Sequence, residues 1–234
     1  MRLAAHQPNY LPYLGFFHKI CLSDIFVIMD TAQFVKSGPF AWMNRNRIRT
    51  KDGWIWLTVP VLTKGKFPVS LLDAEIDNNT DWRERHWKSI YYNYHKAPYF
   101  KLYGDFFEDL YKREWRLLRE ICEEAIFYLM RELNIDVKIA HASGLGIESK
   151  DSEFLAEACR KLGADTYIYG KHGEDYQDAA VFEQNNIRLA PQDFKHPAYH
   201  QLDQPFIECI SAIDLLFNHG RDSRDILMGR KIIE

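Results

Sequence analysis

The residues best suited to chemistry are concentrated in the first thirty positions. His6, His18 and Asp30 are titratable, and histidine serves as a general base near neutral pH because its unperturbed pKa is about 6.5. His6 follows a short apolar segment and precedes Pro8, in a loop where we expect a ligand to bind. We predict catalytic roles for His6 and Asp30. The same stretch supplies side chains predicted to bind the substrate: Gln7, Asn9, Tyr10, His18 and Lys19.

Two further polar groups follow later in the chain. Residues 164–169 are typical of a strand that exits into Gly170, Lys171 and His172, with Tyr176 nearby. We predict His172 as a catalytic residue, and Lys171 and Tyr176 as substrate contacts. Between residues 30 and 50 the predicted substrate-binding residues are Gln33, Asn44, Arg45 and Asn46, where forked guanidinium donors suit a carboxylate or phosphate.

The elements that must position these residues follow from the hydrophobic pattern. Buried strands are predicted at residues 3–5, 25–29, 138–140, 164–169 and 187–190, and helices at 14–21, 152–162 and 179–184. Strands that alternate with helices predict an α/β fold with a Rossmann-like, mostly parallel sheet. Ligands bind at the carboxyl ends of such strands. We therefore expect the loops after residues 5, 29 and 169, together with residues 44–47, to line one cleft.

The middle of the chain has a different pattern. Residues 54–62 and 69–76 predict strands, and Asp52-Gly53 predicts a tight hairpin turn. From Asp81, which with Glu84 resembles a capping box, the pattern becomes helical, with apolar or aromatic residues recurring every four positions to Tyr94. A long helical zone is predicted at 106–133 and a final helix at 205–218. We expect one α/β domain over 1–234 with a helical insertion or subdomain at about 80–135.

Composition limits the possible partners. The net charge of -3 argues against nucleic acid as a partner, and the absence of a long apolar run argues against a signal peptide or membrane span. The 4 Cys are far apart and no predicted helix carries a His pair at H-x-x-x-H spacing, so we assign no metal. A glycine-containing segment at 143–150 precedes a predicted helix, which indicates either a weak anion site or a simple N-cap. We expect a cytoplasmic protein with a small-molecule substrate; cofactor and oligomeric state stay open.

One segment carries a family resemblance. The sequence HQPNYLP at 6–12, followed by LGFF at 14–17 and Lys19, resembles the N-terminal signature of the WbqC-like protein family. Similar blocks continue to residues 211–220, so the resemblance covers nearly the whole chain. It implies a role in bacterial surface polysaccharide (O-antigen) biosynthesis, with transfer of glycine or another acyl or aminoacyl group to a sugar nucleotide or related precursor.

The predicted roles follow from this implication. His6 would remove a proton from the acceptor, while Asn9, Tyr10, Asn44 and Asn46 would orient the substrate. Arg45, Lys171 or His172 would stabilise the developing oxyanion.

Two alternatives remain open at this point. The order of strand, His-bearing loop, helix and a strand ending in Asp is also similar to HIGH-type nucleotidyltransferases and pantothenate synthetase. This likeness implies an ATP-dependent ligase or nucleotidyltransferase, although the strict H-x-G-H spacing is absent. The third possibility is a non-catalytic protein that binds a sugar nucleotide.

Overall fold

The computed structural model describes residues 1–38, 41–65, 68–171, 173 and 177–231. The chain divides into two compact units, which are described separately. The first unit contains residues 1–7, 16–32 and 135–195, and the second contains 8–15, 33–134 and 196–234. The expectation of one domain with a helical insertion stays a prediction.

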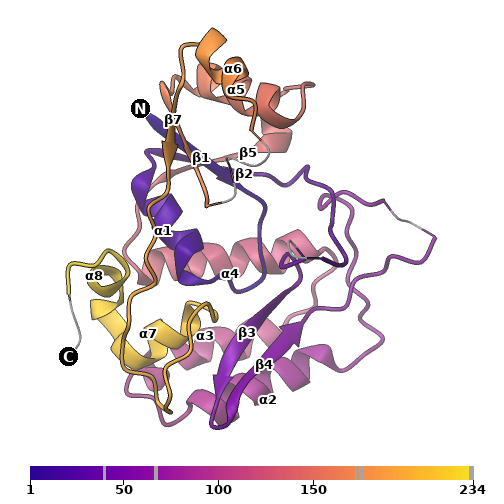
Figure 1. Cartoon of the computed structure of the whole chain (residues 1–234). Helices are drawn as coiled ribbons and strands as arrows, with labels where there is room; N and C mark the ends of the chain where they lie inside the picture. The colour runs from indigo at the N-terminus through magenta and orange to yellow at the C-terminus, as the bar shows by residue number, and fades with distance from the viewer. Residues whose placement is uncertain (39–40, 66–67, 172, 174–176, 232–234) are drawn as a thin grey trace. The chain divides into compact units, whose positions relative to one another are not determined.

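A five-stranded parallel sheet forms the centre of the first unit (Figure 1). Its strands are β1 (Arg2–His6), β2 (Ile25–Ile28), β5 (Lys138–His141), β6 (Thr166–Tyr169) and β7 (Arg188–Pro191). They lie in the order β5-β2-β1-β6-β7. If the five strands of this sheet are numbered 1 to 5 along the chain, their order in the sheet is 3-2-1-4-5. This order is typical of doubly wound folds. The predicted α/β class and Rossmann-like sheet are confirmed.

Helices cover both faces of this sheet, which explains why its strands are apolar on both sides. On one face, α5 (Asp151–Leu162) and α6 (Ala179–Gln184) form a core with residues of β1, β2 and β6 (Figure 1). On the other, Phe16 of α1 (Leu14–Leu22) packs edge-on against Phe26 of β2, with ring centroids 5.6 Å apart. A short 3-10 turn, η1 (Ala142–Gly144), follows β5.

The second unit contains an antiparallel hairpin and several helices. The hairpin strands are β3 (Arg45–Thr50) and β4 (Gly53–Thr58), with Thr50 opposite Gly53. The helices are α2 (Trp82–Tyr94), α3 (Phe100–Lys112), α4 (Leu118–Glu132), α7 (Ile213–His219) and α8 (Ser223–Leu227), with the 3-10 turn η3 (Gly220–Asp222) between the last two. Across the described residues, no helix is both long enough and apolar enough to cross a membrane.

Three elements of the second unit differ from the sequence prediction. The helical zone predicted at 106–133 is interrupted because Arg113 has an extended backbone and Glu120 accepts a hydrogen bond from the Leu117 N–H at 2.9 Å, which starts α4. Residues 69–76 form isolated bridges, such as Gln33 with Ser70, and no strand.

The last helix begins late because a nearby side chain occupies backbone groups that a longer helix would need. It starts at Ile213, whereas the sequence predicted a helix from residue 205. The Gln201 side chain binds both the N–H and the carbonyl of Ile207, at 2.8 and 2.9 Å, which takes these backbone groups away from a helix.

Candidate functional site

His6 is the last residue of β1, and its hydrogen bond fixes the position of its ring proton. Nδ1 lies 2.9 Å from the carbonyl oxygen of Gln7. A carbonyl only accepts hydrogen bonds, so Nδ1 carries the proton and Nε2 is left with the lone pair. The ring also packs edge-on against Phe16 of α1, at 5.2 Å between centroids. The fold therefore holds one tautomer of His6.

The surroundings of His6 favour its neutral form. Burial is the largest effect and the positive charge of Lys19 adds to it; together they lower the pKa of His6 to about 3, although the bond to Gln7 raises it in part. At neutral pH the ring is consequently uncharged, and Nε2 is available to accept a proton.

Lys19 supplies a buried cation close to this ring. Its side chain is only 6% exposed, and Nζ donates to the Ala5 carbonyl at 3.0 Å. Burial lowers the pKa of Lys19 to about 8. A Cβ placed on Gly170 would lie 3.9 Å from Nζ, so the loop after β6 also passes close to this ammonium group.

His6, Lys19 and Gly170 lie at the point of the sheet where the strand order reverses. β1 and β6 are neighbours, and the chain leaves them toward opposite edges of the sheet. Ligands of open α/β sheets bind outside the carboxyl ends of the two strands at such a switch point. Here those ends carry His6 and Gln7 on one strand and Gly170 and Lys171 on the other. The geometry therefore brings a neutral imidazole and a cation to the ligand-binding edge.

Asp30 lies at the same edge, but its carboxylate is engaged. It is 1% exposed, and both its oxygens accept hydrogen bonds from Ser143, from the backbone N–H at 2.9 Å and from Oγ at 2.5 Å. Ser143 belongs to η1, directly after β5. Asp30 thus ties the exit of β2 to the exit of β5, and its predicted catalytic role stays a prediction.

His18 is held on the outer side of α1. Its Nδ1 lies 3.2 Å from the side-chain nitrogen of Gln192, and its ring packs against Phe194 at 5.1 Å. Burial lowers the pKa of His18, partly opposed by Asp193. Gln192 directly follows β7, so this contact also belongs to the carboxyl edge of the sheet.

Two of the predicted site residues are outside the described part of the chain. They are His172, predicted as catalytic, and Tyr176, predicted to contact substrate. Lys171 is described and exposed, and Gln7 is half-buried. The predicted substrate contacts of Lys171 and Gln7 stay predictions.

The last five residues of the HQPNYLP segment, 8–12, belong to the second unit. Tyr10 is fully buried there, and its hydroxyl contacts Nδ1 of His86 at 2.9 Å and the hydroxyl of Tyr111. Asn9 is 8% exposed, and its amide oxygen has no hydrogen-bond partner among the described residues. Tyr10 is therefore part of a packed core, whereas Asn9 retains an unused acceptor.

The side chains predicted around the hairpin mostly bind backbone groups of the second unit. Asn44 donates to the Val59 carbonyl at 2.8 Å, and Arg45 donates from Nε to the Ala41 carbonyl at 2.9 Å. Asn46 donates to the Leu11 carbonyl at 2.6 Å and accepts from the backbone N–H of the next residue at 2.8 Å. Gln33 is exposed. Their substrate contacts, and the single cleft expected from the sequence, stay predictions.

Other candidate chemistry is limited in the described residues. No group of three His, Cys, Asp or Glu side chains in that part of the chain is arranged to hold a metal ion. In the 143–150 segment, Ser149 donates to Glu157 at 3.0 Å and Lys161 binds the Leu145 carbonyl. Polar groups of this loop therefore hold the loop on α5.

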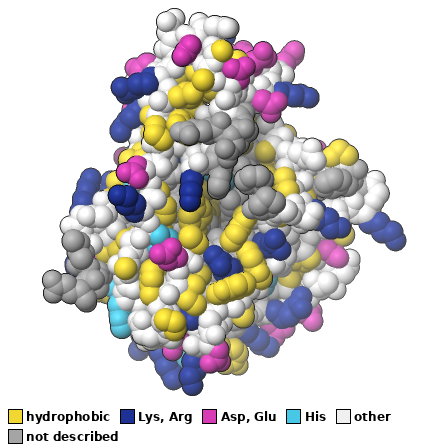
Figure 2. All heavy atoms as spheres, viewed as in Figure 1, with side chains coloured by type: hydrophobic (Ala, Val, Ile, Leu, Met, Phe, Trp, Pro, Cys, Tyr) yellow, Lys and Arg dark blue, Asp and Glu magenta, His cyan; other side chains and the backbone are white. Residues whose placement is uncertain are grey.

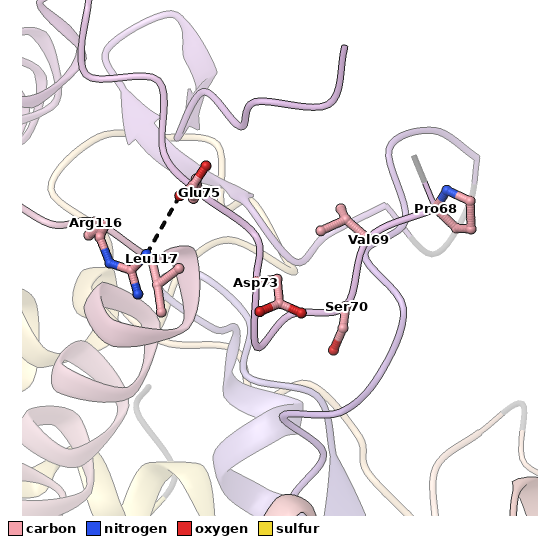
Figure 3. A pocket seen from close by; sticks show the side chains of 7 residues that line it. All are labelled: Pro68, Val69, Ser70, Asp73, Glu75, Arg116 and Leu117. Atoms are coloured by element: carbon pink, nitrogen blue, oxygen red, sulfur yellow. Dashed lines mark ion pairs between the residues drawn. The ribbon is translucent and has the colours of Figure 1, made fainter. Parts of the chain in front are cut away.

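One hollow of about 360 Å³ lies in the second unit, between residues 68–75 and the start of α4. Figure 3 shows Arg116 reaching toward Glu75, at 3.5 Å, with Pro68 at the opposite end. None of the predicted site residues lines it. This hollow therefore does not coincide with the predicted site, and the arrangement of chemical groups favours the edge of the parallel sheet.

Sequence reasoning missed two partners that the fold supplies, Ser143 and Gln192. Ser143 and Gln192 lie two or three residues after the strands predicted at 138–140 and 187–190. The strand-exit rule that we used for residues 5, 29 and 169 would therefore have found both. It also missed three tryptophans around the hairpin, Trp42, Trp54 and Trp56, because most aromatic residues were interpreted as core.

A family model and a curated relative each match nearly the whole chain. The model of the WbqC-like protein family matches residues 7–226. A curated relative, the uncharacterized protein Rv1507c of Mycobacterium tuberculosis (strain ATCC 25618 / H37Rv), is 34% identical over 236 residues, which covers 97% of this chain and 97% of the relative. No solved structure matches the chain.

Proposed function

The chain belongs to the WbqC-like protein family, and we propose that it is a cytoplasmic enzyme transferring an acyl or aminoacyl group, for example glycine, to a sugar nucleotide or related precursor of a bacterial surface polysaccharide. One observation carries the proposal. It is the neutral His6 ring at the β1–β6 switch point, with its Nδ1 proton fixed on the Gln7 carbonyl. Acyl transfer to an amine or hydroxyl needs a proton acceptor, and Nε2 of His6 is suited to that role.

In the proposed step, Nε2 of His6 takes a proton from the acceptor amine or hydroxyl while the acceptor atom attacks the carbonyl carbon of the donor. The carbonyl electron pair moves onto oxygen and gives a tetrahedral intermediate. When this intermediate collapses, the bond to the leaving group breaks, and the leaving group takes the proton from His6. The acceptor has then exchanged one hydrogen for the acyl group, and His6 is neutral again.

Lys19 adjusts the basicity of His6 in this proposal. A base with a pKa near 3 is weak, and part of that lowering comes from the Lys19 charge. An anionic group of the substrate bound to Lys19 offsets this charge and stabilises the imidazolium form, which raises the pKa of His6. Lys171, exposed on the loop after β6, supplies a second positive charge for the same anion.

Asp30 has a positioning role in this scheme. Because Ser143 engages both of its carboxylate oxygens, Asp30 is better suited to hold two exit loops than to exchange protons with a substrate. The rigid edge that results keeps His6 and Lys19 in place.

A second candidate is the ATP-dependent ligase or nucleotidyltransferase. The 3-2-1-4-5 strand order favours it, because nucleotide phosphates bind at the switch point of such sheets. In that reaction a carboxylate is joined to adenylate, with release of pyrophosphate. Strand order is evidence from fold alone, so we rank it below transfer from a preformed acyl donor.

Two assays in sequence test the proposal. A thermal-shift screen of nucleotides, sugar nucleotides and acyl-CoAs first selects ligands that stabilise the fold. Mass spectrometry then follows the selected acceptor with each acyl donor, with and without ATP. We expect the acceptor to gain the mass of one acyl group less one hydrogen, without ATP. Transfer only with ATP, with AMP or pyrophosphate released, indicates the ligase instead. Tight binding without turnover for any donor overturns the enzyme proposal.

A further inference from the structure

Five side chains on and next to the β3–β4 hairpin form a surface that has no assigned role in the proposed reaction, apart from the oxyanion contact predicted for Arg45. They are Trp42, Trp54, Trp56, Arg45 and Arg47, here called the tryptophan–arginine surface. The Trp56 ring lies 4.9 Å from Trp42 and 5.6 Å from Trp54, measured between centroids. The Arg45 guanidinium lies 4.6 Å from the Trp56 ring, and that of Arg47 lies 5.0 Å from the Trp54 ring. All these distances are within the range of stacking and cation–π contact.

The hairpin register explains how this surface forms. Side chains two residues apart in a strand point to the same face, so Arg45 and Arg47 project together, as do Trp54 and Trp56. Arg47 stands directly opposite Trp56 across the strand pair. The opposite face carries buried Asn46. Figure 2 shows basic and hydrophobic side chains side by side over the hairpin.

This surface is open to solvent, and its charge is not neutralised within the described chain. Trp54 is 41% exposed, and the other four side chains are half-buried. Backbone carbonyls orient the guanidinium groups: Arg45 donates to Ala41 and Arg47 to Cys209, each at 2.9 Å. Among the described residues, no carboxylate forms an ion pair with Arg45 or Arg47.

A second arginine–tryptophan pair in the same unit shows what a purely structural contact looks like. The Arg113 guanidinium lies 4.4 Å from the Trp115 ring. There, however, Arg113 is paired with Glu124 at 2.8 Å, and the Trp115 N–H donates to the Leu110 carbonyl at 2.8 Å. This pair is satisfied internally, whereas the tryptophan–arginine surface keeps two oriented cations beside an exposed indole.

We infer that the tryptophan–arginine surface binds a nucleoside phosphate. A base has a flat π-face that stacks on an indole, and phosphate oxygens match the forked donors of a guanidinium group. Stacking on indole rings and hydrogen bonds to carbonyls hold the guanidinium groups before a ligand arrives, which reduces the entropy lost on binding. The net charge of -3 makes a single nucleotide a better fit than a long nucleic acid. This inference goes beyond the proposed function, because it assigns a ligand class to four residues that have no role in the His6 step and to Arg45, for which only an oxyanion contact was predicted.

The test is isothermal titration calorimetry of the full chain with ADP and UDP at low salt. We expect saturable binding that weakens at least tenfold in Arg47→Gln and in Trp54→Leu. Arg113→Gln is the matched control, and we expect its affinity to stay within twofold of the parent. Circular dichroism melting shows that each variant is folded. If Arg47→Gln does not fold, Arg45→Lys, which keeps the charge and removes the fork, is expected to weaken binding in its place.

Several results would overturn the inference. One is the absence of saturable binding at millimolar ADP and UDP, and another is an equal loss of affinity in Arg113→Gln. Binding of inorganic pyrophosphate as tight as that of ADP would show that no ring is recognised. Binding of glucuronic acid in preference to both nucleotides would indicate an acidic-sugar surface. This assay needs no acyl donor, so its failure leaves the transferase proposal standing, and a failed transfer assay leaves the binding result standing.

Discussion

His6 of the first unit and His86 of the second unit have similarly lowered pKa values and differ in their hydrogen bonds. Burial is the main cause that lowers the pKa of each ring to about 3. Nδ1 of His86 forms a hydrogen bond with the Tyr10 hydroxyl, 2.9 Å away. His86 also forms a hydrogen bond with the backbone of Thr58. Its ring lies edge-on to Trp82. His6 has its Nδ1 proton on a carbonyl at a strand end, which leaves Nε2 with the lone pair.

This difference shows that a lowered pKa identifies burial and does not by itself identify a site. Both rings are neutral at pH 7 because burial disfavours the charged form of each. The two rings differ in their place in the fold and in their hydrogen-bond partners. His86 joins α2 to Tyr10 inside a core, whereas His6 ends a strand at the switch point of a parallel sheet. The predictions below test this distinction in order of decreasing effect.

The largest effect is expected from His6→Ala. Loss of a general base typically lowers turnover by roughly 10²–10⁴-fold, and we expect a loss of this size in the transfer assay. The melting temperature, followed by circular dichroism, should change little beside that loss. Full turnover in His6→Ala would remove His6 from the mechanism and make the two histidines functionally equivalent.

Lys19→Met is expected to change how the free energy of unfolding depends on pH. Burial lowers the pKa of Lys19 from 10.5 to about 8, so between these values the unfolded chain binds more protons than the folded chain. This group therefore makes the parent more stable as pH rises from 8 to 10.5, by about 3 kcal/mol. Lys19→Met removes that contribution. Urea unfolding at pH 7 to 10 measures it, and identical pH slopes for parent and variant would contradict it.

Asp214→Asn tests a buried acid of the second unit. Burial raises the pKa of Asp214 from 3.8 to about 6, although hydrogen bonds from Tyr199 and Tyr94 lower it in part. Between these pH values the folded state binds more protons, so the parent loses about 3 kcal/mol of stability as pH rises through this window. We expect Asp214→Asn to remove the loss in urea unfolding at pH 4 to 7. Asp105→Asn, at an exposed position of α3, is the control and should keep the parent slope.

The smallest effect is expected from His86→Phe. Phenylalanine keeps the ring but leaves the Tyr10 hydroxyl and the Thr58 backbone without this partner, which costs about 1–3 kcal/mol. The destabilisation should be smaller at pH 6 than at pH 8, by about 0.8 kcal/mol, because at pH 6 the unfolded parent binds a proton at His86 and the folded parent does not. Turnover per folded molecule should match the parent. A loss of turnover as large as that of His6→Ala would mean that the comparison between the two histidines is wrong.

The sequence allowed the regular elements near the site to be predicted with few errors. The predicted strand at 25–29 is β2 (Ile25–Ile28), and the helix at 179–184 is α6. The four-residue spacing from Trp82 to Tyr94 correctly identified the buried face of α2. These features depend on local periodicity, which the backbone geometry of a helix or strand imposes on neighbouring residues.

Predictions failed where one side-chain hydrogen bond or one backbone conformation ends a helix that the hydrophobic pattern would continue. Gln201 keeps Ile207 out of the helix predicted at 205–218, and an extended Arg113 divides the zone predicted at 106–133. Neither effect is visible in hydropathy, because each depends on one residue's backbone conformation or on one side chain reaching another segment.

The sequence by itself determined that this is an α/β protein of the WbqC-like family, that His6 and Asp30 directly follow strands, and that Lys19 lies in the helix between them. Only the tertiary structure decided that Ser143, 113 residues from Asp30, binds both of its oxygens, that Lys19 lowers the pKa of His6, and that Arg47 lies over Trp54. The physical reason is that burial, proton position and stacking depend on atoms brought together by the fold, and a residue's neighbours in sequence do not specify them.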